Sequence, residues 1–270
     1  MMSKPRDTYT HGHHESVLRS HRWRTAENSA AYLLPHLAPG QSVLDVGCGP
    51  GTITLDLARQ VAPGVVVGVD RVEPPLETAR ADAAAAGATN VRFERGDAYA
   101  LPFPDASFDV VHAHQLLQHM TEPVAVLTEM ARVCAPGGMV AARDSDYAAM
   151  TWFPQLPLLD RWLELYEAIA RGNGAEPDAG RRLLSWARAA GFEEVASSAS
   201  TWCFATPEDR VWWGGTWADR VTASAFADQA LDRGLSDAAE LAAIAGAWLD
   251  WAARDDGWFT VLHGEVICRR

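Results

Sequence analysis

Short apolar runs alternate with longer amphipathic segments through the first half of the chain. Three runs are rich in valine and bounded by turn residues, as buried strands are, at residues 43–46, 65–69 and 108–113. Three segments have the length and composition of helices, at residues 52–61, 74–87 and 121–133. Strands that alternate with helices in this way form a parallel sheet with right-handed crossovers. The pattern therefore predicts an α/β core between residues 41 and 144.

The second half of the chain has a different pattern. Helical segments dominate after residue 144, at residues 155–171, 178–190 and 207–253, and two further strands are expected, at residues 194–204 and 258–269. Two more helical segments, residues 15–24 and 25–37, precede the first strand. No repeat or low-complexity linker separates these parts. We expect one domain over residues 1–270, with N-terminal lid helices (1–37), a ligand-binding core (40–144), a region that includes a helical cap (145–258) and a final strand (259–270).

The first strand ends in a loop with three glycines on alternate positions, Gly47, Gly49 and Gly51. Glycine suits such a turn because it adopts backbone conformations that other residues avoid, and without a Cβ its backbone can lie flat against a bound molecule. The helix that follows points its free N–H groups toward the same place. Taken alone, the loop also fits a strand-to-helix corner without a ligand.

Five segments, in order, resemble class I S-adenosylmethionine (SAM)-dependent methyltransferases. The loop has the spacing G-x-G-x-G after Asp45, whereas dinucleotide-binding proteins use G-x-G-x-x-G. An acid, Asp70, ends the second strand, and Asp97 follows the third. Residues 108–114 resemble the family's fourth strand, and residues 135–142 resemble its glycine turn into the fifth. The resemblance covers residues 40–144.

The resemblance implies a fold and a cofactor. The fold is an α/β Rossmann-like, seven-stranded and mostly parallel sheet with helices on both faces and an antiparallel last strand, to which this chain adds a helical cap. The cofactor is SAM. Asp70 accepts hydrogen bonds from the ribose hydroxyl groups, Asp97 and Ala98 hold the adenine edge, and His114 and Gln115 contact the methionine portion.

The N-terminal helices are expected to close over the cofactor, where Arg22, Arg24 or Tyr9 meets the methionine carboxylate. These arginines equally suit a solvated helix face, and the two aspartates alone would suit plain turns. The candidate cofactor-binding residues are Gly47, Cys48, Gly49, Gly51, Asp70, Arg71, Asp97, Ala98, His114, Gln115, Arg22 and Arg24.

Candidate catalytic residues follow the fourth and fifth strands. Because SAM carries an activated methyl group, the protein needs mainly to align the acceptor, and a base helps only with some acceptors. His119 is a candidate base, and it equally suits a structural histidine that fixes the short helix after the strand. Asp144, Asp146 and Tyr147 are alternative bases or acceptor contacts.

Composition narrows the class of partner. The 270 residues include 23 Lys and Arg against 35 Asp and Glu, for a net charge of −12. A nucleic-acid substrate would need a surplus of basic residues, so a small-molecule methyl acceptor is expected instead. The sequence shows neither an apolar run of membrane-spanning length nor the apolar segment of a signal peptide. We therefore expect a cytoplasmic protein, and the oligomeric state stays open.

Cysteine and histidine spacing predicts no metal site. The four cysteines are scattered, at Cys48, Cys134, Cys203 and Cys268, and none has a zinc-ligand spacing. We expect all four to be reduced, with Cys48 packed beneath the glycine turn. His11, His13 and His14 form a cluster without a ligand pattern, which favours a solvated or lid segment.

Tryptophan is concentrated in the second half of the chain. Ten of the 11 tryptophans lie beyond residue 150, and residues 40–144 contain none. Since the core of this fold does not need tryptophan, these side chains favour a pocket for a flat hydrophobic ligand, although many suit plain packing within the cap. Candidate wall residues are Tyr147, Trp152, Trp213 and Trp217.

The function expected is methyl transfer from SAM to a small hydrophobic or aromatic acceptor, such as a quinone, a phenol or a polyketide-like compound. The core most resembles the ubiquinone/menaquinone and natural-product methyltransferase group. Two alternatives remain. One is a SAM-binding regulatory or sensing protein without methyl transfer, and the other is an NAD-dependent oxidoreductase, which the glycine spacing disfavours.

Overall fold

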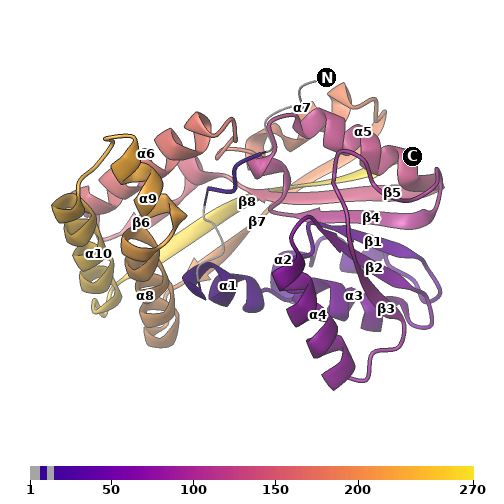
Figure 1. Cartoon of the computed structure of the whole chain (residues 1–270), viewed down its shortest axis with the longest axis horizontal. Coiled ribbons are helices and arrows are strands. Elements are labelled where there is room, and N and C mark those ends of the chain that lie inside the picture. Colours follow the sequence, from indigo (N-terminus) through magenta and orange to yellow (C-terminus); the bar gives the residue numbers. More distant parts are fainter. Residues whose placement is uncertain (1–6, 11–14) are drawn as a thin grey trace.

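The computed structural model of the chain describes residues 7–10 and 15–270. Figure 1 shows a sheet with helices on both faces and, beside it, a separate group of helices that the long strands β7 and β8 reach. The histidine cluster of His11, His13 and His14 lies outside the described residues.

The described strands belong to one eight-stranded sheet. They are Val43–Val46 (β1), Val66–Asp70 (β2), Val91–Arg95 (β3), Phe108–His114 (β4), Cys134–Ser145 (β5), Thr151–Phe153 (β6), Glu194–Phe204 (β7) and Trp258–Arg269 (β8). The strand order is β3-β2-β1-β4-β5-β8-β6, and β7 pairs with the other edge of β8. Strands β1 to β5 pair in parallel, and β8 is antiparallel to its neighbours. The expected Rossmann-like sheet with an antiparallel last strand is confirmed.

The sheet has one strand more than the seven expected. The short strand β6 pairs with residues 258–260 of β8, just beyond the segment of β8 that pairs with β5. Only three residues form β6, which is too short for an alternating pattern to be recognised in the sequence.

Helices cover both faces of the sheet. The α-helices of the described residues are Glu15–Arg22 (α1), Ala26–Ser29 (α2), Thr52–Val61 (α3), Glu73–Ala85 (α4), Pro123–Val133 (α5), Pro157–Gly172 (α6), Leu183–Ala189 (α7), Pro207–Ala223 (α8), Ala225–Asp232 (α9) and Ala238–Ala252 (α10). Short 3-10 turns lie at Leu34–His36 (η1), Leu117–His119 (η2), Tyr147–Ala149 (η3) and Gly180–Arg182 (η4). Side chains of α5 and α7 pack in the apolar cluster on one face, and those of α2 and α3 pack in the cluster on the other.

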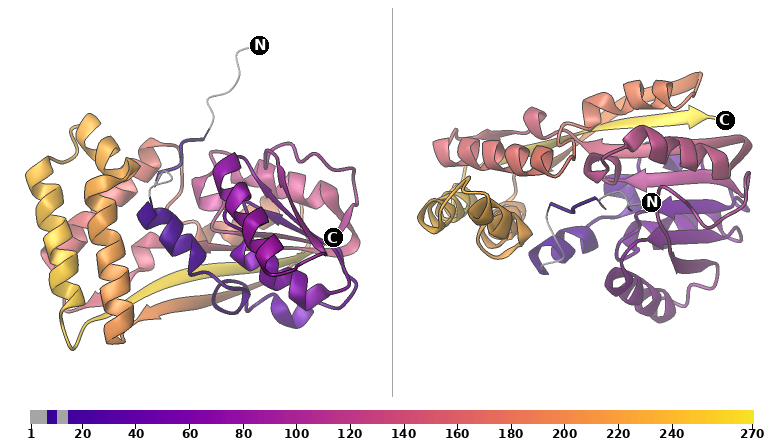
Figure 2. Two further views of the ribbon diagram at one scale, coloured as in Figure 1. Left: turned by 60° about the horizontal axis from the view of Figure 1, so that its bottom comes forward. Right: turned by 45° about the horizontal axis from the view of Figure 1, so that its top comes forward.

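The cap is built from α6, α8, α9 and α10, which lie together beyond one end of the sheet (Figures 1 and 2). Its core contains seven buried tryptophans together with Phe204, Phe226 and Phe259. Strand β8 passes through both parts, since Phe259 and Val261 belong to the cap core and Val266 and Cys268 to the core of the sheet. The two parts are therefore joined by continuous strands.

One N-terminal element differs from its prediction. Residues 25–37 do not form one helix: α2 spans four residues, Thr25 caps its first turn, and η1 follows after a break. The side chains expected to pack on the sheet still do so, because Leu33 is buried and Tyr32 and Leu37 pack against the same cluster.

Candidate functional site

A cavity lies at the carboxyl ends of β1, β2 and β4, which is where open α/β sheets bind ligands. One wall comes from the glycine loop and from the segments that follow β2, β3 and β4. The opposite wall comes from β7, η3 and the cap helix α8, and α1 lies beside both. The cavity thus joins the core to the cap.

The glycine loop has the backbone that only glycine adopts readily. Gly47, Gly49 and Gly51 have φ angles of +75°, +53° and +78°. A Cβ added at Gly51 would lie 2.7 Å from the Phe93 ring and 2.8 Å from Ala79, so Gly51 is required by packing beneath the loop. Gly51 does not line the cavity, whereas Gly47 and Gly49 do.

Cys48 lies between these glycines and lines the cavity. Its side chain packs beneath the turn, because a Cβ added at Gly68 of β2 would lie 2.9 Å from the Cys48 Sγ. Burial raises the pKa of the Cys48 thiol well above its ordinary value. All four cysteines are free thiols.

Asp70 ends β2 and lines the cavity. Its carboxylate accepts hydrogen bonds from the backbone N–H groups of Gly49 and Val72, each at 3.0 Å. These bonds fix the carboxylate against the glycine loop. The neighbouring Arg71 also lines the cavity, and its guanidinium donates to the Asp7 carbonyl at 3.1 Å.

Asp97 and Ala98 follow β3 at the same edge of the sheet. The Asp97 carboxylate accepts from the Tyr99 N–H at 3.0 Å, which shapes the turn. Both residues line the cavity. The acids predicted from the second and third strands therefore lie in one cavity with the glycine loop.

Arg24 lies between the core and β7. Its Nη2 donates to the Gln115 Oε1 at 2.5 Å, and its guanidinium lies 5.8 Å from the Trp202 ring centre. Burial lowers the pKa of Arg24 to about 10, which leaves it charged near neutral pH. Its Nε is buried, with no hydrogen-bond partner among the described residues.

Gln115 links Arg24 to His263 of β8 by hydrogen bonds. Its Nε2 lies 2.8 Å from the His263 Nε2, and the His263 Nδ1 lies 3.1 Å from the Val261 carbonyl oxygen. A carbonyl oxygen only accepts, so the Nδ1 carries the proton and the Nε2 accepts from the Gln115 amide. The Gln115 oxygen is then the atom that faces Arg24.

His114 precedes Gln115 at the end of β4 and lines the cavity. It is 5% exposed, and neither ring nitrogen has a hydrogen-bond partner among the described residues. Burial, reinforced by nearby arginines, lowers the pKa of His114 well below its ordinary value. A buried neutral imidazole with two unused polar atoms is typical of a wall that meets a ligand.

His119 lines the cavity at the end of η2. Its Nε2 lies 3.0 Å from the Gln118 Nε2, and its ring meets the Tyr9 ring edge-on at 4.7 Å. The Gln118 Oε1 accepts from the Ser145 hydroxyl, so the amide nitrogen donates to His119. Burial lowers the pKa of His119 to about 3. These contacts favour the structural alternative for this histidine.

Asp144 lies behind the cavity wall rather than in it. It is fully buried, its Oδ1 accepts from the Gln118 N–H at 3.1 Å, and it does not line the cavity. Burial raises its pKa to about 7. Asp146 is likewise buried and forms an ion pair with Arg181 at 2.5 Å. Neither acid lines the cavity.

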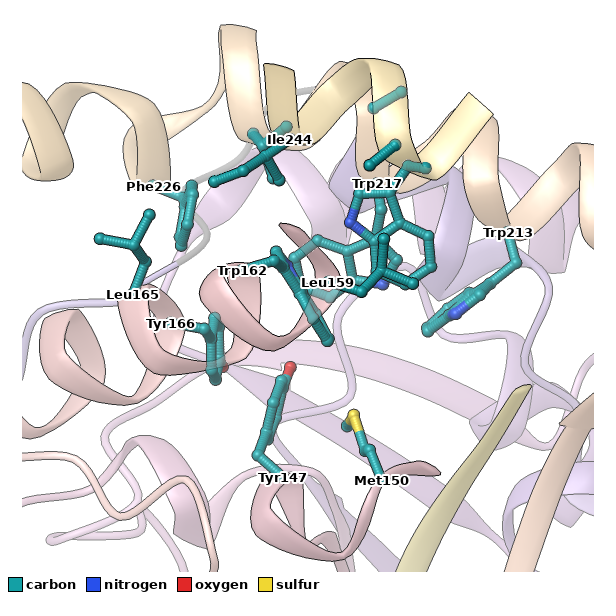
Figure 3. Packing of buried hydrophobic residues seen from close by; sticks show 14 of the residues in the cluster. Tyr147, Met150, Leu159, Trp162, Leu165, Tyr166, Trp213, Trp217, Phe226 and Ile244 are labelled. Carbon is teal, nitrogen blue, oxygen red and sulfur yellow. The ribbon is translucent and has the colours of Figure 1, made fainter. Parts of the chain in front are cut away.

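The four aromatic wall candidates divide into two pairs. Tyr147 and Trp213 line the cavity. Trp152 and Trp217 do not, although all four belong to the cap core. Figure 3 shows Trp217 among the packed side chains and Tyr147 nearer the sheet.

One cofactor candidate lies elsewhere. Arg22 is the last residue of α1, is exposed and does not line the cavity. Arg22 lies on the solvent side of α1. Arg24, two residues beyond the end of this helix, lines the cavity instead.

Several lining residues were not singled out by the sequence. The cap-side wall also contains Met150, Trp202, Trp212 and Arg220. Trp213, Trp217 and Arg220 recur at the spacing of one helix face, so this face was detectable. The sequence did not show that this helix packs against the cavity.

Two kinds of feature are absent from the described residues. They contain no group of three or more His, Cys, Asp or Glu side chains that could hold a metal ion. No helix in the described part of the chain is long and apolar enough to cross a membrane.

Comparisons with known proteins agree with the fold. Residues 37–194 match the family model of a methyltransferase domain. An uncharacterized methyltransferase of Schizosaccharomyces pombe is 36% identical over 100% of this chain and 99% of its own length. A demethylmenaquinone methyltransferase of Lactococcus lactis is 39% identical over 47% of this chain and 48% of its own. The YcgJ protein of Bacillus subtilis has a similar crystal structure, with a TM-score of 0.59 and 21% identity over 90% of this chain and 99% of that one.

Proposed function

Because the chain belongs to the class I SAM-dependent methyltransferases, we propose that it methylates a small, flat, hydrophobic acceptor between the sheet and the cap. One observation carries this proposal. A single cavity is lined on one side by the cofactor motif and on the other by Tyr147, Trp202, Trp212 and Trp213. Stiff aromatic walls suit flat apolar ligands, and the shared cavity lets such a ligand reach the methyl group.

The residues of the core fit the cofactor. The loop at Gly47 and Gly49 lines the cavity with backbone in the left-handed region, and we assign the Asp70 carboxylate to the ribose. The unpartnered nitrogens of His114 and the Nε of Arg24 lie in the same lining. We assign Asp97 and Ala98 to the adenine, and Arg24 to the methionine carboxylate.

SAM supplies a methyl group that its sulfonium charge has already activated. The chain's own task is then to hold the acceptor atom in line with that group and to exclude water. A neutral His119 whose Nε2 accepts from Gln118 is a weak base, since effective bases have pKa values near the working pH. We therefore assign His119 to shaping the cavity. Acceptors that ionise easily fit such a site best.

The relatives support the acceptor class in part. The demethylmenaquinone methyltransferase that matches 47% of this chain acts, by its name, on a demethylated menaquinone, which is a flat and hydrophobic molecule. The matched share is about the length of the core, so the cap of the present chain is free to select a different acceptor.

The test is release of S-adenosylhomocysteine by the full-length protein with SAM and a panel of quinones, phenols and polyketide-like compounds. At least one flat acceptor is expected to raise release above the acceptor-free rate.

Asp70→Ala should weaken SAM binding by about 1.5 to 3 kcal/mol, because it removes a charged acceptor of hydrogen bonds. Asp105→Ala is the control, since Asp105 is 75% exposed and pairs with Arg132. Tight SAM binding without release for any compound would indicate a sensing protein instead.

A further inference from the structure

The cap-side wall of the cavity carries a positive charge. Among the described lining residues beyond residue 144, Arg220 is the one charged side chain. Its neighbours in that wall include Tyr147, Met150, Trp212 and Trp213. Arg220 is 4% exposed, so its guanidinium is removed from solvent in a wall that is mostly aromatic and apolar.

The guanidinium is held rigidly from two sides. Its Nη2 donates to the Ser20 hydroxyl at 3.0 Å, and its carbon lies 4.5 Å from the Trp217 ring centre. Trp217 is itself fixed in the cap core, edge-on to Trp162 at 4.5 Å and stacked with Trp248 at 5.9 Å. Figure 3 shows Trp217 on α8 above Trp162 and Tyr147. Arg220 is therefore pre-positioned, as a binding group must be.

The surroundings favour an anion at this place. The nearby tyrosines are neutral at physiological pH, since burial raises the pKa of Tyr147 to about 12. Burial is also the main influence on Arg220 and lowers its pKa, as expected for a cation removed from water. A planar guanidinium has five N–H donors. Such a group can hold several hydrogen bonds at once and matches an oxyanion in the geometry that carboxylates prefer.

The acidic lining residues lie at the cofactor end. Asp45 contacts His112 and Thr54 at 2.8 and 2.6 Å, and Asp70 accepts from the glycine loop. Arg24 and Arg71 also line the cofactor side, so cations lie on both sides, whereas these acids lie where the ribose and adenine are assigned. A negative group of the acceptor is therefore repelled by the acids and attracted to Arg220.

We propose that the methyl acceptor binds as an anion, with a carboxylate or an ionised hydroxyl group of a flat aromatic molecule against the Arg220 guanidinium. This inference rests on the proposed function, because it takes the cap-side cavity as the acceptor site. Arg220 is then a specificity residue. It selects acidic aromatics from among the compounds that fit the aromatic walls.

The test is calorimetry on the full-length protein saturated with S-adenosylhomocysteine, with two pairs of probes. The first pair is naphthoate and naphthamide, and the second is an ionised hydroxynaphthoquinone and its methyl ether. Within at least one pair, the anion is expected to bind about tenfold or more tightly than the neutral compound. A preference in the first pair alone indicates a carboxylate, and in the second alone an ionised hydroxyl group.

Arg220→Met should abolish this preference, and Arg220→Lys should keep part of it. The matched control is Arg19→Met: Arg19 also joins α1 to α8, through Thr216 and Asp219, but does not line the cavity. Unchanged affinity of each variant for S-adenosylhomocysteine confirms an intact fold. If Arg220→Met does not fold, the wild-type protein and Arg220→Lys still decide the question.

Three results would overturn the inference: equal binding of anion and neutral compound by the wild type, equal losses for both in Arg220→Met, or no binding of any probe. Release of S-adenosylhomocysteine with neutral acceptors would then leave the proposed function standing. Conversely, an anion preference without release for any acidic aromatic would keep the anion site and contradict the proposed methyl transfer.

Discussion

His119 shows how the neighbours of a residue decide its chemistry. The sequence allows a base or a structural histidine, since only its place after β4 is visible there. The structure adds a chain of hydrogen bonds from Ser145 through Gln118 to the His119 Nε2, and that chain uses the lone pair a base would need. Such a chain depends on side-chain directions in three dimensions, which no spacing in the sequence encodes.

Asp144 should make stability depend on pH. Its pKa is raised from 3.8 to about 7 by burial, so the folded state binds this proton more tightly than the unfolded state does. Between these two values, a rise in pH ionises Asp144 first in the unfolded chain and lowers the free energy of unfolding. The slope from this one group reaches about 1.4 kcal/mol per pH unit. Above about pH 7, Asp144 is ionised in both states and lowers the free energy of unfolding no further.

Asp144→Asn should remove that part of the slope, because the amide is neutral and its oxygen still accepts from Gln118. Urea unfolding at several pH values between 4 and 7 checks this for both proteins. Asp105→Asn is the exposed control and should keep the wild-type slope. The same slope in Asp144→Asn as in the wild type would contradict the assignment.

At the level of elements, the sequence predicted regular segments better than short ones. The bounds of α3, β7 and β8 agree with the residue ranges expected, because each is a long segment with clear periodicity. The second N-terminal helix was predicted but is not one helix, and the three-residue β6 was not predicted. Contacts with the sheet decide both. In the site, the loop motifs were visible in the sequence, whereas Arg220 and Trp202 reach the cavity only because α8 and β7 fold over it.

The hydrogen bond between Gln115, which follows β4, and His263 of β8 should control cofactor affinity through Arg24. His263→Leu removes the acceptor of the Gln115 amide and should weaken S-adenosylhomocysteine binding about two- to tenfold, the usual value of one buried hydrogen bond. His263→Gln should restore much of the affinity, because its side-chain oxygen accepts in the same way. Calorimetry on these variants, on Arg24→Met and on the Arg24→Met/His263→Leu pair forms a double-mutant cycle. Strictly additive losses would show that His263 does not act through Arg24.

A second contact between elements concerns Gly264 of β8. A Cβ there would lie 2.0 Å from the Gly180 carbonyl oxygen and 2.4 Å from its carbonyl carbon. Because both obstacles are backbone, Gly264→Ala should lower the free energy of unfolding by about 2 kcal/mol or more. Gly246→Ala is the matched control: no atom lies within 4 Å of its added Cβ in α10, and alanine favours a helix by up to about 1 kcal/mol. Urea denaturation that found equal stabilities for the two variants would contradict this packing.

At the scale of the whole molecule, β8 links the cap to the sheet. Phe259 and Val261 fill the cap core, while Val266 and Cys268 fill the core of the sheet. β7 runs beside β8 from Glu194 to Phe204, so both strands cross from one core to the other. Loss of either core would leave half of this strand pair without its packing partners. The cap and the sheet should therefore unfold together.

Tryptophan fluorescence and circular dichroism test this prediction directly. Seven of the 11 tryptophans lie in the cap core, so fluorescence reports chiefly on the cap, whereas circular dichroism reports on helices throughout the chain. A single cooperative transition requires both signals to have the same midpoint. S-adenosylhomocysteine should raise the two midpoints together, since a ligand of the folded state stabilises the whole cooperative unit. If the fluorescence midpoint fell below the other and stayed there when the ligand was added, the cap would be an independent unit, and the cofactor core would stay folded without the acceptor wall.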